Sequence, residues 1–357
     1  MTSRYPHLNQ TLPTPKPMIG GAKGIGNVRY PIFASVLILG LMLYLFRSSP
    51  DLTSYRHHYA PTLPEGTIPE GKVKVTYWGV SSMLLDDGET QVLIDGFVTR
   101  PPMRKVFFGK IASDTGLVKE MVEQHGLEHL SAVITCHSHY DHALDAPYFA
   151  KYTEAPLIGT ESTMQIGRGA GLSEDKLQLY QAGQPFHLVK FKITPLQSKH
   201  VPAQKTAQWL GLQSNETRNI AQPLHQPAKA NAFEEGGTYD LFIEHGNHSL
   251  LVKASANYLP NALDSLNADV LFLGIGLLHP NGEAFEQAYY RQTVGAVKPS
   301  LVIPIHWDNF FIPLRPPLLP NPYPDEVKGA LDFLLQQTAK DSIDLQMLDA
   351  FQKMYLF

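Results

Sequence analysis

Cysteine is almost absent from this chain of 357 residues, which contains Cys136 and no other thiol. A disulfide within the chain is therefore excluded, although a lone cysteine does not identify a cellular compartment. In other respects the composition is that of an ordinary folded protein, with 43% hydrophobic and 17% charged residues. No break in composition divides the globular part, so we expect one large domain there.

Acidic residues are missing from the first 50 positions, which hold five Lys and Arg and no Asp or Glu. Because the whole chain has 29 basic and 33 acidic residues, residues 51–357 hold 24 bases against 33 acids, a formal charge of −9. This acidic part has no basic stripe of the kind that binds phosphate backbones. We therefore expect no nucleic-acid partner.

Long apolar runs are also scarce, and the clearest is the uncharged stretch 31–46. As a helix it would span about 24 Å, short of the roughly 30 Å hydrocarbon core, but flanking arginines could make up the difference. We expect residues 1–29 to be a disordered basic tail, 30–47 a transmembrane anchor, 48–71 a linker, and 72–357 the globular domain. A cleaved signal peptide is the alternative, but residues 46–50 lack a clear small-x-small cleavage site.

The basic flank of this run also predicts a localisation. One apolar run predicts a single pass through the membrane. Because positive charge is retained on the cytoplasmic side, the N-terminus of the protein is expected to be cytoplasmic. Its domain would then lie on the outer side, periplasmic or extracytoplasmic.

The globular part alternates between short apolar strands and helical segments. Strands are expected at residues 72–78, 82–85, 91–94, 130–134, 186–194, 241–244, 249–252, 269–273, 301–305 and 345–348, and helices at 117–125, 283–295 and 326–337. Residues 97–113 are interpreted as a loop flanking a cleft. Residues 201–236, which are polar and without period, are interpreted as an insertion over a site.

Three imidazoles and a carboxylate follow the apolar run 130–134 within six residues: His137, His139, Asp141 and His142. His137 and His139 are two apart, so in an extended segment both rings leave the same side. Asp141 and His142 then open a short helix and can reach a neighbouring point. Nitrogen and carboxylate ligands without thiolate suit zinc first, then iron or manganese. The thiol of Cys136 should point away from His137 and is not counted as a ligand.

This H-x-H-x-D-H signature resembles the metallo-β-lactamase superfamily. The resemblance implies an α+β fold, a four-layer αββα sandwich, over roughly residues 72–357. It also implies two metal sites, the first from His137, His139 and His200 and the second from Asp141, His142 and His306. His200 and His306 each follow an expected strand, as the family's later ligands do. Asp95 would support the ligands, although a simple turn carboxylate is the other interpretation.

The chain departs from the family where a bridging aspartate is usual. After the strand 249–252 the sequence continues Lys-Ala-Ser-Ala-Asn, which places Ser255 at the possible bridging position. A neutral serine is a poor bridge, so we expect either a second metal that binds more weakly or a protein that holds one ion only. Asp264 and His279 are weaker substitutes.

The resemblance implies a metal-dependent hydrolase, akin to the lactonase, phosphodiesterase and N-acyl phosphatidylethanolamine phospholipase D branches, and the expected anchor would hold it at a membrane. A metal-activated hydroxide would attack an ester, lactone or phosphodiester, with Asp141 as the catalytic proton carrier. Trp307, Phe310 and Phe311 would line an apolar cleft for a small-molecule or lipid-like substrate, or would simply pack. The alternatives are a mononuclear iron sulfur dioxygenase of the same superfamily and a degenerate metal-binding protein without turnover.

Overall fold

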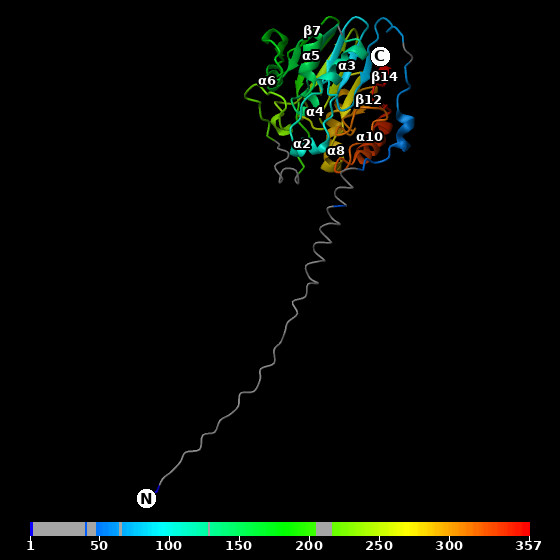
Figure 1. Cartoon of the computed structure of the whole chain (residues 1–357). Helices are drawn as coiled ribbons and strands as arrows, with labels where there is room; N and C mark the ends of the chain where they lie inside the picture. Colours follow the sequence, from blue (N-terminus) through cyan, green and yellow to red (C-terminus); the bar gives the residue numbers. More distant parts are fainter. Residues whose placement is uncertain (3–39, 41–47, 64–65, 128, 205–215) are drawn as a thin grey trace. The chain divides into compact units, whose positions relative to one another are not determined.

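The computed structural model of the protein describes residues 1–2, 40, 48–63, 66–127, 129–204 and 216–357 (Figure 1). The chain divides into the units Met1–Leu45 and Phe46–Phe357. The predicted tail 1–29 and the predicted anchor 30–47 lie outside the described residues, apart from residues 1, 2 and 40. The second unit carries the fold and the site.

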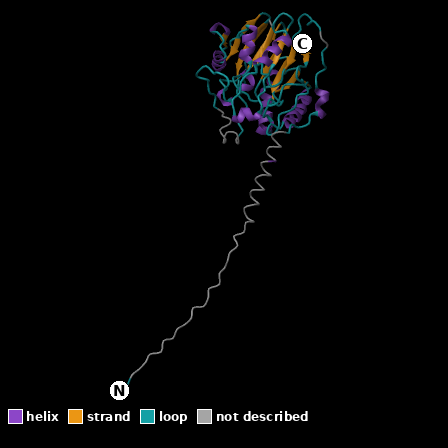
Figure 2. Cartoon of the chain, viewed as in Figure 1, coloured by secondary structure: helices purple, strands orange, loops and turns teal. Residues whose placement is uncertain are grey.

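Two seven-stranded mixed sheets are formed by the described residues (Figures 1 and 2). The first has the order β14 (Lys353–Tyr355), β1 (Lys74–Tyr77), β2 (Met83–Asp86), β3 (Gln91–Ile94), β4 (Leu130–Ile134), β5 (Leu157–Gly159), β6 (Leu177–Leu179). The second has the order β13 (Asp344–Leu345), β12 (Leu301–Ile305), β11 (Val270–Gly274), β10 (His248–Lys253), β9 (Tyr239–His245), β8 (Phe191–Gln197), β7 (Phe186–Leu188). The α+β class with two mixed sheets is thus confirmed.

Each sheet changes from antiparallel to parallel pairing at its centre. In the first sheet, β14 to β3 pair antiparallel and β3 to β6 pair parallel. In the second, β10 to β13 pair parallel, whereas β7 to β10 pair antiparallel. Because parallel strands end at a common edge, residues just beyond β3 and β4 lie together, as do residues just beyond β10 and β12.

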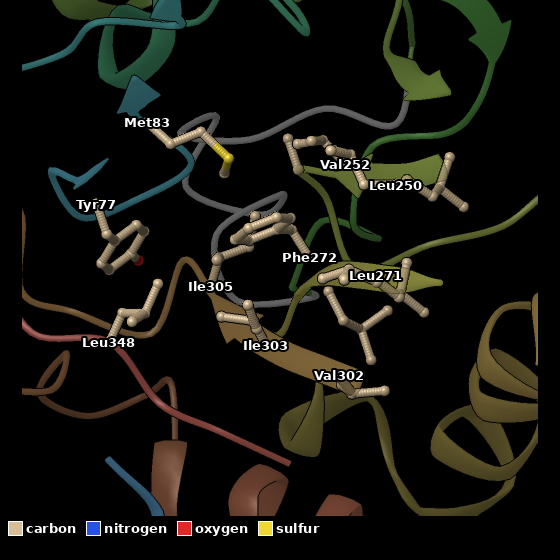
Figure 3. Packing of buried hydrophobic residues seen from close by; sticks show 14 of the residues in the cluster. Tyr77, Met83, Leu250, Val252, Leu271, Phe272, Val302, Ile303, Ile305 and Leu348 are labelled. Carbon is tan, nitrogen blue, oxygen red and sulfur yellow. The ribbon is translucent and has the colours of Figure 1, made fainter. Parts of the chain in front are cut away.

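Alternate residues of the first sheet enter different cores, as strand geometry requires. Ala132 and Ile134 of β4 belong to the main apolar core, whereas Val133 between them packs with residues of α3 and α5 in a second cluster. Side chains of both sheets, among them Tyr77, Met83, Val252, Phe272 and Ile305, form the main core (Figure 3).

Helices complete the architecture. They are α2 (Met103–Phe108), α3 (Thr115–His125), α4 (Tyr140–Ala143), α5 (Ala146–Thr153), α6 (Glu161–Gly169), α8 (Glu283–Gln292), α9 (Val294–Val297) and α10 (Val327–Asp341). Four 3₁₀ turns join them in the described residues: η1 (Thr53–His58), η2 (Glu174–Lys176), η3 (Ala230–Ala232) and η4 (His279–Asn281). Helix α3 begins where the Asp114 carboxylate accepts from the backbone N–H groups of Gly116 and Leu117, and it ends at the left-handed Gly126.

Three segments differ from expectation. The expected loop 97–113 contains helix α2, and the expected linker 48–71 contains η1, whose Tyr55 is buried in the main core. The strand expected at 345–348 is reduced to β13 (Asp344–Leu345), and β14 pairs instead with β1 at the opposite end of the chain. These contacts are long-range, so local sequence patterns do not reveal them.

The predicted single-pass membrane localisation, with a cytoplasmic N-terminus and an outer catalytic domain, is corrected. Among the residues that the structure describes, no helix combines the length and the apolar character that crossing a membrane requires. The longest described helix, α10, has 15 residues and spans about 22 Å.

Candidate metal centre

The first group of ligand-type side chains consists of His137, His139 and His200. His137 and His139 follow β4, and His200 lies in the segment just after β8. The His139 ring is 4.9 Å from the His137 ring and 4.6 Å from the His200 ring, centroid to centroid. One ligand atom from each residue lies within 4.8 Å of the others. The three histidines that the resemblance assigned to one metal therefore do meet.

The second group consists of Asp141, His142 and His306. Asp141 and His142 lie on α4, and His306 directly follows β12. Asp141 Oδ2 lies 3.3 Å from His306 Nε2 and 3.7 Å from His142 Nε2. These three residues also meet the 4.8 Å criterion. The rings of His137 and His142 are 3.8 Å apart, so the two groups adjoin.

The ring of His142 is held from behind by a buried carboxylate. Asp95, which follows β3, has Oδ2 at 2.8 Å from His142 Nδ1 and accepts the backbone N–H of Cys136 at 2.8 Å through Oδ1. Ser81 hydrogen-bonds both Asp95 Oδ2 and His142 Nδ1. A carboxylate on Nδ1 directs Nε2 toward the second group. Asp95 thus has the supporting position that the resemblance implied, and Ser81 is a partner that the sequence did not indicate.

His306 is fixed through the turn before β2. Its backbone N–H donates to the Val80 carbonyl at 2.7 Å, and the Val80 N–H donates to Asp308 Oδ1 at 2.7 Å. Asp308 Oδ2 forms a fully buried ion pair with Arg100 at 2.7 Å. Val80 and His306 both have left-handed backbone angles, with φ of 54° and 60°. Such strain is tolerated where surrounding contacts over-determine the backbone. Sequence reasoning missed Arg100 and Asp308.

Several ligand atoms are buried and unpaired, which fits a metal ion. Neither ring nitrogen of His137, nor Nε2 of His142, has a hydrogen-bond partner among the described residues. Buried polar nitrogens normally find partners, so this arrangement suits coordination. Burial, with His200 and His142 nearby, lowers the pKa of His139 to about 3, and burial lowers the pKa of His137 as well. Both rings are therefore neutral near pH 7, the state that binds metal.

Asp141 is the acidic member of the centre. Burial by itself would raise its pKa, but His142 and His306 lower that pKa well below the usual value. Asp141 is consequently anionic, and it is the one negatively charged member of the six ligand-type side chains.

Ser255, at the position proposed for a bridging ligand, makes a hydrogen bond to the backbone. Ser255 lies just beyond β10 and is buried, but its hydroxyl accepts the backbone N–H of Val201 at 2.8 Å. Of the two substitutes, Asp264 is exposed, and His279 pairs with Glu286 at 2.9 Å. Neither belongs to the ligand groups formed by the described residues.

Aromatic side chains extend outward from His306. Phe310 meets the His306 ring edge-on at 5.7 Å and lies 4.6 Å from the ring of Phe311, which stacks on Phe107 at 6.3 Å. Phe108, next to it on α2, is 91% exposed. Trp307, by contrast, is fully buried and packs in the main core, so it does not line the site.

The residues expected to cover the site are partly described. Within 216–236, Ile220 N–H donates to Ser162 Oγ at 2.9 Å, and Leu224 N–H donates to the Gln165 carbonyl at 2.9 Å. This part therefore packs on α6. Residues 205–215 lie outside the described residues.

The two-sheet fold and its histidine-rich edge define a protein of the metallo-β-lactamase type. Residues 90–307 match the family model described as the beta-lactamase superfamily domain, and the chain belongs to that family.

Two curated relatives match shorter stretches. A UPF0173 metal-dependent hydrolase of Heliobacterium modesticaldum is 35% identical over 86 residues, which are 24% of this chain and 29% of that protein. A second UPF0173 metal-dependent hydrolase, from Thermoplasma volcanium, is 29% identical over 101 residues, or 28% of this chain and 37% of that protein. The chain thus spans about a third of the length of these relatives.

Among solved structures, the metallo-beta-lactamase fold protein YhfI of Bacillus subtilis is similar at 16% identity and a TM-score of 0.49, with 79% of this chain and 99% of that one covered. A metallo hydrolase of Ignicoccus hospitalis, Igni18, is similar at 16% identity and a TM-score of 0.46, with coverage of 80% and 98%.

Proposed function

We propose that this protein is a metal-dependent hydrolase that cleaves an ester, lactone or phosphodiester bond in a small-molecule substrate. One observation carries the proposal: six ligand-type side chains from distant strand ends converge in two adjoining groups. Buried ring nitrogens among them lack partners in the described residues. Both relatives named above are called metal-dependent hydrolases.

The donor set favours zinc, as one or two ions, and is chemically compatible with iron or manganese. When bound, the ion supplies an activated water and polarises the substrate oxygen. Asp141 is the catalytic residue of the chain itself. Its anionic carboxylate lies between His142 and His306, where it can accept the proton of an attacking water and return it to the leaving group.

An amphipathic or lipid-like substrate is supported by the aromatic side chains beside His306. Phe310, Phe311 and Phe107 form a continuous series of ring contacts that leads from this ligand to the exposed Phe108. An apolar substituent of the substrate lying along these rings would remove them from water. Each methylene so buried contributes about 0.8 kcal/mol.

The completeness of the second group supports hydrolysis over the two alternatives. A mononuclear iron dioxygenase needs one ion, yet Asp141, His142 and His306 form a second three-residue group. Against a degenerate protein without turnover stand the six ligand-type residues that the chain retains in two complete groups.

The test combines metal analysis with a substrate panel. When the protein is supplied with zinc, iron or manganese, its zinc content should be the highest of the three metal contents. It should hydrolyse members of an ester, lactone and phosphodiester series. Within the active class, kcat/KM should rise at least about tenfold when the apolar substituent is lengthened by several methylenes. Iron content with oxygen consumption, and no hydrolysis, would contradict the proposal.

His137→Ala and His139→Ala should each reduce metal content and abolish hydrolysis, because a three-ligand site does not tolerate loss of a ligand. His187→Ala, at an exposed histidine on β7, is the matched control and should behave as the unmodified protein. Normal turnover in either ligand variant would refute the assignment.

A further inference from the structure

The segment that carries His200 is held at several points by the end of β10. Three residues at and just beyond this strand end hydrogen-bond the segment 198–201, and we call them the β10 clamp: Lys253, Ser255 and Asn257. Strand β8 pairs antiparallel with β9, and β9 pairs antiparallel with β10. Strands β8 and β10 therefore run in the same direction, and their ends lie at the same edge.

Ser255 acts on His200 through one peptide group. Its Oγ accepts the Val201 N–H at 2.8 Å, and the Val201 carbonyl lies 3.0 Å from His200 Nδ1. Because a carbonyl can only accept, Nδ1 must carry the proton, which leaves the lone pair on Nε2. The serine hydroxyl thus fixes the peptide that selects the ligating tautomer of His200.

Asn257 and Lys253 hold the same segment on either side. Asn257 Nδ2 donates to the His200 carbonyl at 2.6 Å. Lys253 Nζ donates to Ser198 Oγ at 2.9 Å and pairs with Asp240 Oδ2 at 2.8 Å. Both charges of this pair are almost fully buried, so neither can swing into water. A buried pair that keeps its hydrogen bonds resists displacement strongly.

We propose that Ser255 is a positioning residue for the metal ligand His200 and is not itself a metal ligand. The clamp replaces a charged ligand at this strand end by a set of hydrogen bonds that set the position and the tautomer of His200. The inference rests on the metal site of the proposed function. It goes further, because it assigns the affinity of the His137, His139 and His200 group to residues outside that group.

Full-length, metal-free protein titrated with Zn²⁺ and with Co²⁺ tests the proposal. Ser255→Ala should weaken metal binding at the site of His137, His139 and His200 by about 10- to 100-fold, as loss of an outer partner of a ligating histidine does. The number of bound ions should stay unchanged. Ser255→Thr keeps the acceptor oxygen and should bind nearly as the unmodified protein. Ser249→Ala is the matched control, since this serine lies at the other end of β10 and donates to Asn267.

Two outcomes would overturn the inference. If Ser255→Ala lost one ion and kept the affinity of the other, Ser255 would be a ligand. If it kept both number and affinity, the clamp would not position His200. Should Ser255→Ala fail to fold, Asn257→Ala removes another clamp contact, and unchanged affinity there would also refute the inference. Absence of metal binding in the unmodified protein would instead refute the metal site itself.

Discussion

Gly276 offers a steric probe of the second ligand group. This glycine follows β11 and lies against His306: a Cβ built on it would be 2.8 Å from the His306 carbonyl oxygen and 2.9 Å from its Nδ1. The Gly276 backbone lies outside the left-handed region, so Gly276→Ala adds a methyl group without adding backbone strain. Its effect should therefore be confined to His306.

The size of that effect follows from the distances. Ordinary contact begins near 3.4 Å, so His306 must move by about 0.5 Å to admit the methyl group, and overpacking of this kind costs about 1–3 kcal/mol of stability. Ligand distances in metal sites hold to about 0.2 Å. A displacement of that size should consequently take His306 out of coordination range while leaving the first group intact.

Zinc titration of the metal-free protein and urea unfolding measure the two consequences. We expect Gly276→Ala to weaken ion binding at the second ligand group by about tenfold or more and to leave binding at the first group unchanged. It should also lower the free energy of unfolding by about 1–3 kcal/mol. Gly295→Ala is the matched control: its new methyl group would lie 3.6 Å from Tyr290 O, which is an ordinary contact distance. Equal second-site affinity in Gly276→Ala and the unmodified protein, or selective loss of the first ion, would refute the reasoning.

Two further predictions concern buried groups. Asp95→Asn places an amide against His142 Nδ1, now 2.8 Å from the carboxylate. If the amide nitrogen faces that atom, the ring proton moves to Nε2, and zinc affinity at the second site should fall about 10- to 100-fold in a titration; unchanged affinity would refute the role of Asp95. Burial of His125 beside Trp78 and Phe351 lowers its pKa from 6.5 to about 4. As the pH falls, His125 is protonated at a higher pH in the unfolded chain than in the folded one. The free energy of unfolding should therefore fall by about 2 kcal/mol between about pH 6.5 and pH 4. His125→Phe should remove that part of the pH dependence, and an identical profile of unfolding free energy against pH in both proteins would contradict the prediction.

Local sequence predicted the parts of the centre that depend on spacing. His137 and His139 alternate after a buried strand, and Asp141 and His142 open the next helix, so four ligand-type residues could be named from one short segment. Alternation likewise predicted most strands of the two sheets. In both cases the information lies within a few residues, where the periods of strand and helix act directly.

Family resemblance supplied His200 and His306, which spacing alone could not have selected among 15 histidines. The structure brings both to the site because β8, β10 and β12 run in the same direction in the second sheet and end at one edge. The localisation inferred from residues 31–46 did not hold, since no helix among the described residues is long and apolar enough to cross a membrane.

Only the tertiary structure decided which polar residues support the ligands. Ser81 reaches His142, Arg100 holds Asp308 beneath His306, and Ser255 accepts from Val201. Each pair joins residues far apart in the chain and has no shared period or motif. Ser255 could be recognised from sequence as the wrong residue for a bridge. Its hydrogen bond to Val201, next to His200, exists only because the second sheet places the ends of β8 and β10 at one edge.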